Sequence, residues 1–314
     1  MTTCLRLTLA LAIVVALSSP GLAAQAAKVF ATPEEAAKAF VDACERHDTV
    51  ALTSILGSDA DELIRSGDAV QDTIRLDRFV RRAKEALRVE ADPFRPGQLL
   101  MIVGKDGWPA PLPIVKAGAG YRFDASAAKA EILAQRIGRN ELNAIATLRD
   151  LGQAEQDYAY ADPSKSGIHD YAQQIPSDPG RRNGLYWQAG DGEASSPLSG
   201  VVSRAAAQGY EPPAPGKPMI HHGYVFRILT SQGPNAAGGA RDYVVRNVMI
   251  GGFAMVAYPV EYGVSGVKTF VVNHDGIVWE KDLGPRTTAI ASAMRRYNPD
   301  KTWKASPQEP AEEH

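Results

Sequence analysis

The spacing of hydrophobic residues predicts helices followed by strands in the first half of the chain. Thr32 is a typical N-cap, a proline follows it, and Glu35 completes a capping box. Apolar residues then recur at helical spacing as far as Cys44, and residues 68–88 repeat an amphipathic helical pattern. Beyond them stand short strand-like runs, QLLMIVG, WPAPLPIV and GYRFD. We therefore expect residues 28–125 to form an α+β domain in which helices wrap a curved antiparallel sheet.

A longer helical pattern opens the second half. It begins at Ser126, and Gly138 is expected to interrupt it, with Asn140 capping a second segment. Five short runs rich in β-branched and aromatic residues follow, YVFRILT, RDYVVRNVM, GFAMVAYPV, GVKTFVVN and GIVWEK. Because short turns join them, they predict an antiparallel meander. Residues 126–305 are therefore expected to form a second α+β domain, a long helix on an antiparallel sheet, and residues 306–314 a disordered tail.

The first 26 residues have the three parts of a secretory signal peptide. Arg6 precedes the apolar run LTLALAIVVAL, and small residues end the segment at GLAAQAA, near the expected cleavage site. The apolar run is shorter than the roughly 20 residues that span a bilayer, so no membrane span is expected after cleavage. We expect an exported protein, periplasmic or secreted. Cys44 is then the single remaining cysteine, expected to be buried, and it excludes an intramolecular disulfide.

Charge and motif content narrow the classes of function. The formal net charge is −2, and no basic stretch alternates with aromatic residues, so nucleic acid is not an expected partner. The glycine-rich run SQGPNAAGGARDY lacks the Lys-Ser/Thr ending of a phosphate loop and is expected to be a hairpin, so no cofactor is expected. His221 and His222 are expected to point to opposite faces of a strand, and no metal site is expected.

Several long motifs resemble a known family. In chain order they are DGWPAPLPIV, RIGRNEL, GLYW, SPLSG, HHGYVFRILTSQG, GGFAMVAYP and KTFVVNHDGIVWEKDLG, and together they resemble the bacterial exported family known as domain of unknown function 2950. This resemblance implies no established activity. In texture, the first half is similar to nuclear-transport-factor-2-like domains, and the second half to the heads of type IV pilin-like proteins, but no apolar helix with a processing site precedes Asn140.

The loop GLYWQAGDGEASSPLSG contains the best candidate for a binding surface. An aromatic face buries the C–H surface of a sugar or peptide while neighbouring polar groups fix its orientation. The alternative interpretation is that these aromatic rings only cover the sheet. The ligand-binding candidates are Tyr186 and Trp187, together with Arg227, Gln232, Asp242 and Lys281 if the meander curls towards the loop.

Three functions remain open from the sequence. The first hypothesis is a non-enzymatic binding module for cell-wall glycan, peptide or an envelope protein, because no nucleophile motif with its partners occurs. The second is a hydrolase of cell-wall or extracellular polymer, with acid/base catalysis by Asp191, Glu193, Asp242 or Glu280. The third is a structural subunit of an envelope assembly. Separately, Arg136, Arg139 and Glu141 are expected to form a structural charge cluster in preference to an anion site.

Overall fold

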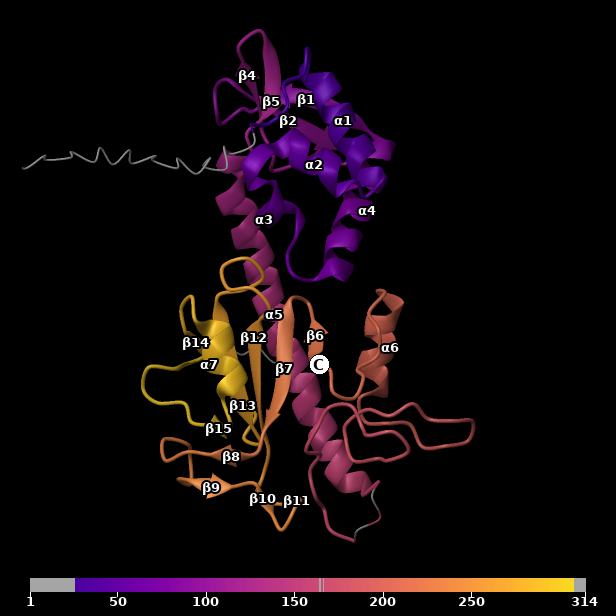
Figure 1. The fold of residues 1–314 in the computed structure, drawn as a ribbon, viewed down its shortest axis with the longest axis vertical. Coiled ribbons are helices and arrows are strands. Elements are labelled where there is room, and N and C mark those ends of the chain that lie inside the picture. Colours follow the sequence, from indigo (N-terminus) through magenta and orange to yellow (C-terminus); the bar gives the residue numbers. More distant parts are fainter. Residues whose placement is uncertain (1–25, 164, 166, 308–314) are drawn as a thin grey trace, which may run out of the picture.

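Two bodies lie one above the other along a single long helix. The computed structural model describes residues 26–163, 165 and 167–307, so almost all of the expected signal peptide, and residues 308–314 of the expected tail, lie outside the described residues. The helix α5 (Ala125–Ala161) runs from the upper body into the lower one (Figure 1). Helices combine with antiparallel sheets in both bodies, which confirms the predicted α+β class.

The upper body consists of helices packed on an antiparallel sheet. Its helices are α1 (Pro33–Glu45), α2 (Thr49–Leu56), the 3₁₀ turn η1 (Gly57–Asp59), α3 (Ala60–Ile64) and α4 (Ala69–Glu85). The strands are β1 (Leu87–Ala91), β2 (Gln98–Val103), β3 (Trp108–Pro109), β4 (Ile114–Ala117) and β5 (Gly120–Phe123), in the order β1-β2-β4-β5 with β3 on β2. The predicted cap is present, since Thr32 Oγ1 accepts the Glu35 N–H at 3.1 Å. Cys44 is fully buried in this core, and burial raises the pKa of its thiol to about 12.

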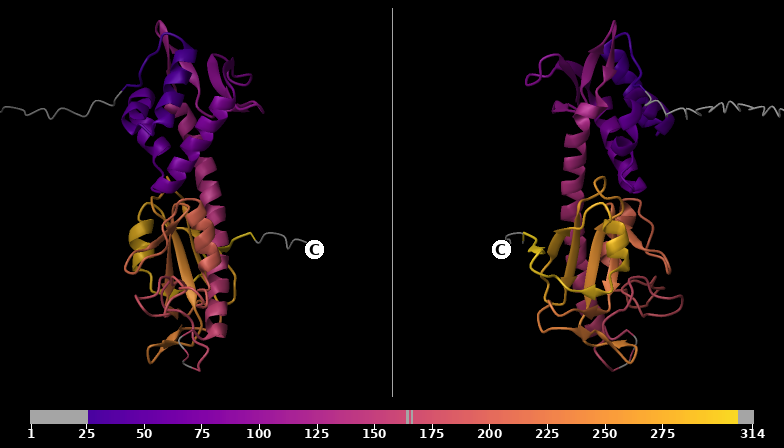
Figure 2. Two further views of the ribbon diagram at one scale, coloured as in Figure 1. Left: turned by 90° about the vertical axis from the view of Figure 1, so that its right-hand side faces the viewer. Right: turned by 60° about the vertical axis from the view of Figure 1, so that its left-hand side comes forward.

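The lower body is a six-stranded antiparallel sheet between two helices. Its strands are β6 (Met219–His221), β7 (Tyr224–Leu229), β12 (Ala254–Pro259), β13 (Lys268–Asn273), β14 (Trp279–Asp282) and β16 (Lys304–Ala305), in the order β16-β14-β13-β12-β7-β6. The long helix α5 covers one face and α7 (Thr287–Ala293) covers the other, as Figure 2 shows. Every residue of β12 is buried, because both faces of this central strand are covered.

Smaller elements surround this sheet, and one of them corrects the predicted meander. They are α6 (Ser199–Ala207), β8 (Ser231–Gln232), β9 (Arg241–Asp242), β10 (Val244–Val245), β11 (Val248–Met249) and β15 (Arg296–Tyr297). The run RDYVVRNVM is not a strand of the main sheet. It is split by a turn at Arg246 and Asn247, whose φ angles of 50° and 66° fit a two-residue hairpin. The glycine-rich run before it joins β8 to β9 as the predicted hairpin.

The helix α5 is continuous, which contradicts the predicted break at Gly138. Gly138 is exposed, and Asn140 lies inside the helix, where its side-chain amide donates to the Ser265 carbonyl at 2.9 Å. Ala128 belongs to the upper hydrophobic core and Leu148 to the lower one. Packing on both sides of Gly138 thus outweighs the roughly 1 kcal/mol that a glycine costs in a helix.

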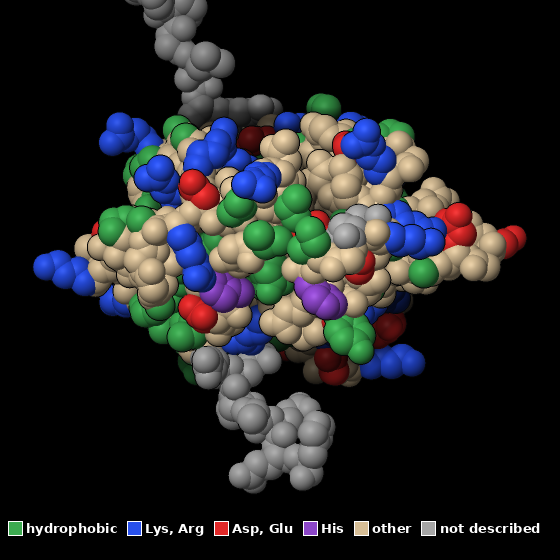
Figure 3. All heavy atoms as spheres, turned by 90° about the horizontal axis from the view of Figure 1, so that it is seen from below, with side chains coloured by type: hydrophobic (Ala, Val, Ile, Leu, Met, Phe, Trp, Pro, Cys, Tyr) green, Lys and Arg blue, Asp and Glu red, His purple; other side chains and the backbone are tan. Residues whose placement is uncertain are grey.

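The surface of the lower body is mixed in character. Seen from below, basic side chains are spread around its rim, among a few acidic ones, with hydrophobic side chains towards the middle (Figure 3). Val245, in β10, and Ile250, directly after β11, are 46% and 49% exposed. Among the described helices, none is both long and apolar enough to cross a bilayer.

A buried carboxyl group lies on the lower half of α5. Glu155 is completely buried, and its Oε2 accepts the Ala172 N–H at 2.8 Å, whereas its Oε1 has no hydrogen-bond partner. Burial raises the pKa of this carboxyl well above its ordinary value of 4.5. Glu155 therefore stays protonated at a pH where the unfolded chain has already released its proton, so stability falls as the pH rises above 4.5.

We expect Glu155→Gln to raise the free energy of unfolding at pH 8, because glutamine keeps the acceptor for Ala172 and cannot ionise. The gain should shrink as the pH is lowered towards 4.5, because the carboxyl of the unfolded chain then also becomes protonated and keeping it protonated in the folded state costs less. Chemical denaturation at several pH values measures this difference. Asp157→Asn, an exposed change on the same helix, is the control. Parallel pH profiles for wild type and Glu155→Gln would contradict the assignment.

Candidate functional site

The aromatic loop is held by a close backbone contact at its start. The Ser177 N–H donates to the Tyr186 carbonyl at 2.7 Å, and the Tyr186 N–H donates to the Ile175 carbonyl at 2.8 Å. A Cβ on Gly184 would lie 2.7 Å from the Ser177 nitrogen, so only glycine fits between the two segments. This pairing fixes where Tyr186 and the next residue, Trp187, emerge from the core.

Trp187 is half-buried and held in place by polar neighbours. Its Nε1 donates to the Ala194 carbonyl at 3.2 Å, and the Arg182 guanidinium lies 5.6 Å from its ring. Arg182 is in turn 3.3 Å from the Glu193 carboxylate. The ring therefore has a defined orientation before any ligand arrives.

Tyr186 and Trp187 line a concave site, which we call the aromatic groove. Its volume is about 660 Å³, within the range typical of ligand pockets. The proline-rich segment 212–215 forms the facing wall, and Asp178, Arg181 and Gln188 supply polar groups. A hydrogen bond from Asn183 holds the pKa of the Asp178 carboxyl below its usual value, so Asp178 is ionised at neutral pH. The groove thus combines aromatic surface with a carboxylate, a guanidinium and an amide.

The other predicted ligand residues do not reach this groove. They are Arg227, Gln232, Asp242 and Lys281. The Arg227 guanidinium donates to two carbonyls at the end of α7, and the Gln232 side chain is buried within the β8–β9 hairpin. Lys281 donates to Thr302 Oγ1 at 2.6 Å, and Asp242 is exposed on β9. Tyr186 and Trp187 pack against the lower hydrophobic core, but these four candidates have their contacts elsewhere and do not line the groove.

The four carboxylates of the hydrolase hypothesis are not brought together across a cleft. Only Glu193 lines the aromatic groove. Asp191 is exposed on the same loop, and Asp242 is exposed on β9. Glu280, on β14, accepts a hydrogen bond from Ser306 Oγ at 3.1 Å and lies 3.5 Å from Lys268. Hydrolysis of a glycosidic bond needs two carboxylates that flank it, an arrangement that these four residues do not form.

The predicted charge cluster is divided between the two bodies. Arg136 is buried, and it donates to the carbonyls of Glu62 at 2.7 Å and Leu63 at 2.6 Å, at the end of α3. Burial lowers its pKa to about 10, which leaves it cationic at neutral pH. Glu141 instead faces the lower body, where its Oε1 accepts the Lys268 N–H at 2.9 Å. Arg139 is exposed.

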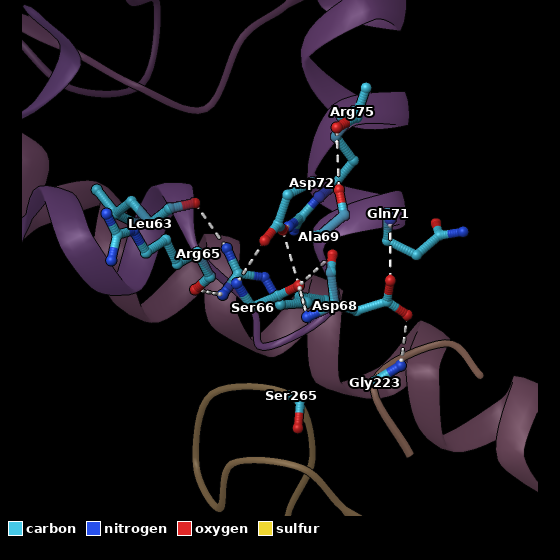
Figure 4. Close-up of polar contacts among 12 residues, drawn as sticks. Leu63, Arg65, Ser66, Asp68, Ala69, Gln71, Asp72, Arg75, Gly223 and Ser265 are labelled. Atoms are coloured by element: carbon cyan, nitrogen blue, oxygen red, sulfur yellow. Dashed lines mark hydrogen bonds and ion pairs between the residues drawn. The ribbon is translucent and has the colours of Figure 1, made fainter. Parts of the chain in front are cut away.

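The junction between the bodies depends on Asp68, which the sequence interpretation missed. Asp68 is 4% exposed and caps α4 by accepting the Gln71 N–H at 3.1 Å. Its Oδ2 also accepts the Gly223 N–H at 2.9 Å and the Tyr210 hydroxyl at 2.6 Å, both from the lower body. Figure 4 shows the carboxylate between the helix start and the Gly223 turn. One carboxylate thus closes a helix end and holds the two bodies together.

The two adjacent histidines lie side by side, which corrects the prediction that they point to opposite faces. His222 and Gly223 form the two-residue turn between β6 and β7, with φ angles of 49° and 75°. This turn brings the imidazole rings of His221 and His222 to a centroid distance of 4.0 Å. Burial, with His222 as a second cause, lowers the pKa of His221 to about 4, so it is neutral at pH 7. Over the described residues, no three His, Cys, Asp or Glu side chains gather as a metal site needs.

We expect Tyr210→Phe to lower the free energy of unfolding by about 1–3 kcal/mol, because the Tyr210 hydroxyl donates to Asp68 and accepts the His222 N–H at 3.1 Å. Urea unfolding followed by tryptophan fluorescence measures the loss. The matched control is Tyr160→Phe, which removes the hydroxyl of a tyrosine that is 87% exposed. Equal stability of Tyr210→Phe and wild type would show that this hydroxyl does not stabilise the junction.

Comparison with known proteins gives one match. No curated protein and no solved structure is similar enough to match the chain. A family described as "Protein of unknown function (DUF2950)" matches residues 27–306, and this range includes both bodies and the aromatic groove. The match confirms the family resemblance that the sequence motifs carry. The chain therefore belongs to the DUF2950 family.

Proposed function

We propose that the chain is an exported, non-enzymatic binding protein whose aromatic groove takes a carbohydrate of the cell envelope. One observation carries this proposal. Tyr186 and Trp187 are half-buried rings that line an open cavity of about 660 Å³, beside Asp178, Arg181 and Gln188. Both rings pack against the lower hydrophobic core and also line this cavity, where polar groups lie beside them as in a typical ligand site.

The groove fits carbohydrate better than an extended peptide. A sugar presents C–H groups to an aromatic face and hydroxyls to carboxylate, amide and guanidinium groups, and all four are present here. Peptides commonly bind by adding a strand to a sheet edge. The facing wall is instead a run of prolines, Pro212, Pro213 and Pro215, which have no N–H to donate to a peptide backbone.

We expect purified cell-wall oligosaccharides to bind the wild-type protein and to raise its melting temperature. Arg181→Ala and Gln188→Ala should weaken binding about tenfold each, because both side chains are exposed and line the groove. Trp187→Ala should abolish binding. Isothermal titration calorimetry measures these affinities, and Tyr160→Ala, at a highly exposed residue that does not line the groove, is the control.

The binding proposal fails if every oligosaccharide that binds does so equally well to wild type, Arg181→Ala and Gln188→Ala. Binding of short peptides alone, with the same dependence on these side chains, would replace carbohydrate by peptide as the ligand. Because Arg181 and Gln188 are on the surface, their truncation keeps the test independent of folding.

Export is the second part of the proposal. The charged, apolar and small-residue segments of the first 26 residues support it, as does the start of the family match at residue 27. We expect the protein expressed in a bacterium to begin between residues 24 and 28, which N-terminal sequencing and intact mass measure. Ile13→Arg should block export by interrupting the apolar run, whereas Ala12→Leu should not. An uncut chain in the cytoplasmic fraction would overturn export.

A further inference from the structure

A second site lies in the upper body, away from the aromatic groove. A cavity of about 400 Å³ opens between α4, the β3 segment and the upper half of α5, and we call it the arginine cavity. Five arginines line it, Arg75, Arg78 and Arg82 from α4 and Arg136 and Arg139 from α5, and its lining includes no Asp or Glu. Like charges on adjacent helices repel one another, so this arrangement costs free energy unless anionic groups compensate for it.

The protein neutralises only part of this charge. Arg75 is paired with Asp72, and Arg82 lies 2.6 Å from Asp106. Arg136 donates to carbonyls at the end of α3. Between residues 26 and 307, among those that the structure describes, no hydrogen bond or ion pair engages the side chain of Arg78 or Arg139. Two guanidinium groups are therefore available at the cavity, one on each helix.

The arginine cavity continues into an apolar one. A space of about 170 Å³ in the same body shares five lining residues with it, Arg75, Phe79, Trp108, Pro111 and Ile132, and is also lined by Asp72, the partner of Arg75. The deeper lining is mostly apolar and includes Leu52 and Met101, which are completely buried. Trp108 stands where the two spaces meet, 40% exposed and 5.5 Å from the Arg82 guanidinium. A ligand here would meet hydrocarbon at depth and positive charge at the mouth.

We propose that this composite cavity binds a small amphipathic anion, with its hydrocarbon part in the apolar space and its carboxylate against Arg78 and Arg139. Burying the hydrocarbon is favourable in proportion to the apolar area removed from water. Guanidinium groups are the side chains best suited to a carboxylate, because they donate two parallel hydrogen bonds. A free inorganic anion would leave the apolar space unfilled, and a neutral hydrocarbon would leave the two arginines without a partner. A ligand with both parts fits both features.

The test compares ligands that differ in one feature each. By isothermal titration calorimetry, octanoate should bind the full-length mature protein, whereas octan-1-ol, which lacks the charge, and acetate, which lacks the chain, should each bind at least tenfold more weakly, since each loses one of the two interactions. Octanoate binding should weaken with added salt and show a negative heat-capacity change. Equal binding of octanoate and octan-1-ol would overturn the role of the arginines.

Variants locate the site. Arg78→Ala with Arg139→Ala should weaken octanoate binding at least tenfold, and because neither side chain has a partner the fold should be unaffected. Arg81→Ala is the matched control, an exposed arginine of α4 that does not line the cavity. Unchanged binding in the double variant would refute the assignment. Gln188→Ala should leave octanoate binding intact, so failure here and failure at the aromatic groove are separate results.

A last arm distinguishes a free acid from a membrane lipid as the source of the anion. Vesicles of phosphatidylglycerol and of phosphatidylcholine are sedimented with the protein. The proposal expects octanoate binding and no difference between the two vesicle types. Sedimentation with the anionic vesicles that is lost in the Arg78 and Arg139 double variant, without any octanoate binding, would overturn the proposal in favour of a membrane surface.

Discussion

The rest of the structure depends on one continuous helix that is part of two hydrophobic cores. With 37 residues and a rise of about 1.5 Å per residue, α5 is roughly 55 Å long. Most helical stability in proteins comes from tertiary packing, and α5 is packed at both ends and at Arg136 and Asn140 in its middle. Ala125 and Ala128 pack in the upper core, and Leu148 and Leu151 in the lower. Neither core is complete without α5, which makes the helix the rigid link between the two proposed sites.

Around that helix, the two bodies meet through polar side chains that satisfy buried backbone groups. Asp68 accepts the Gly223 N–H, Asn140 donates to the Ser265 carbonyl, and Glu141 accepts the Lys268 N–H. Buried backbone groups without partners cost free energy, so these contacts are specific as well as favourable. Two features require a glycine at position 223. Its φ is 75°, and a Cβ there would lie 2.9 Å from the Asn140 amide. Such contacts fix the relative position of the bodies, which apolar packing alone leaves loosely defined.

The sequence predicts local structure here better than it predicts long-range placement. Thr32 caps its helix as expected, because a cap depends on residues three positions apart. The predicted break at Gly138 is wrong because packing against both bodies keeps α5 continuous. The turn at His222 and Gly223 was missed because an Asn-Gly pair is the usual signal, although the glycine before Tyr224 was a clue. The role of Asp68 cannot be predicted from its neighbours in the sequence, because its two partners in the lower body lie 142 and 155 residues further along the chain.

The same reasoning explains why the sequence identifies only part of the lining of the aromatic groove. Tyr186 and Trp187 are adjacent in sequence, so one local pattern identifies both. The groove's other wall, at 212–215, comes from a distant segment whose position is set at Tyr210 by the hydrogen bond to Asp68. Asp68 also begins α4, whose next turns place Arg75 and Arg78 at the arginine cavity. One buried carboxylate therefore helps to position a wall of each proposed site. A change at the junction should alter the geometry of both sites.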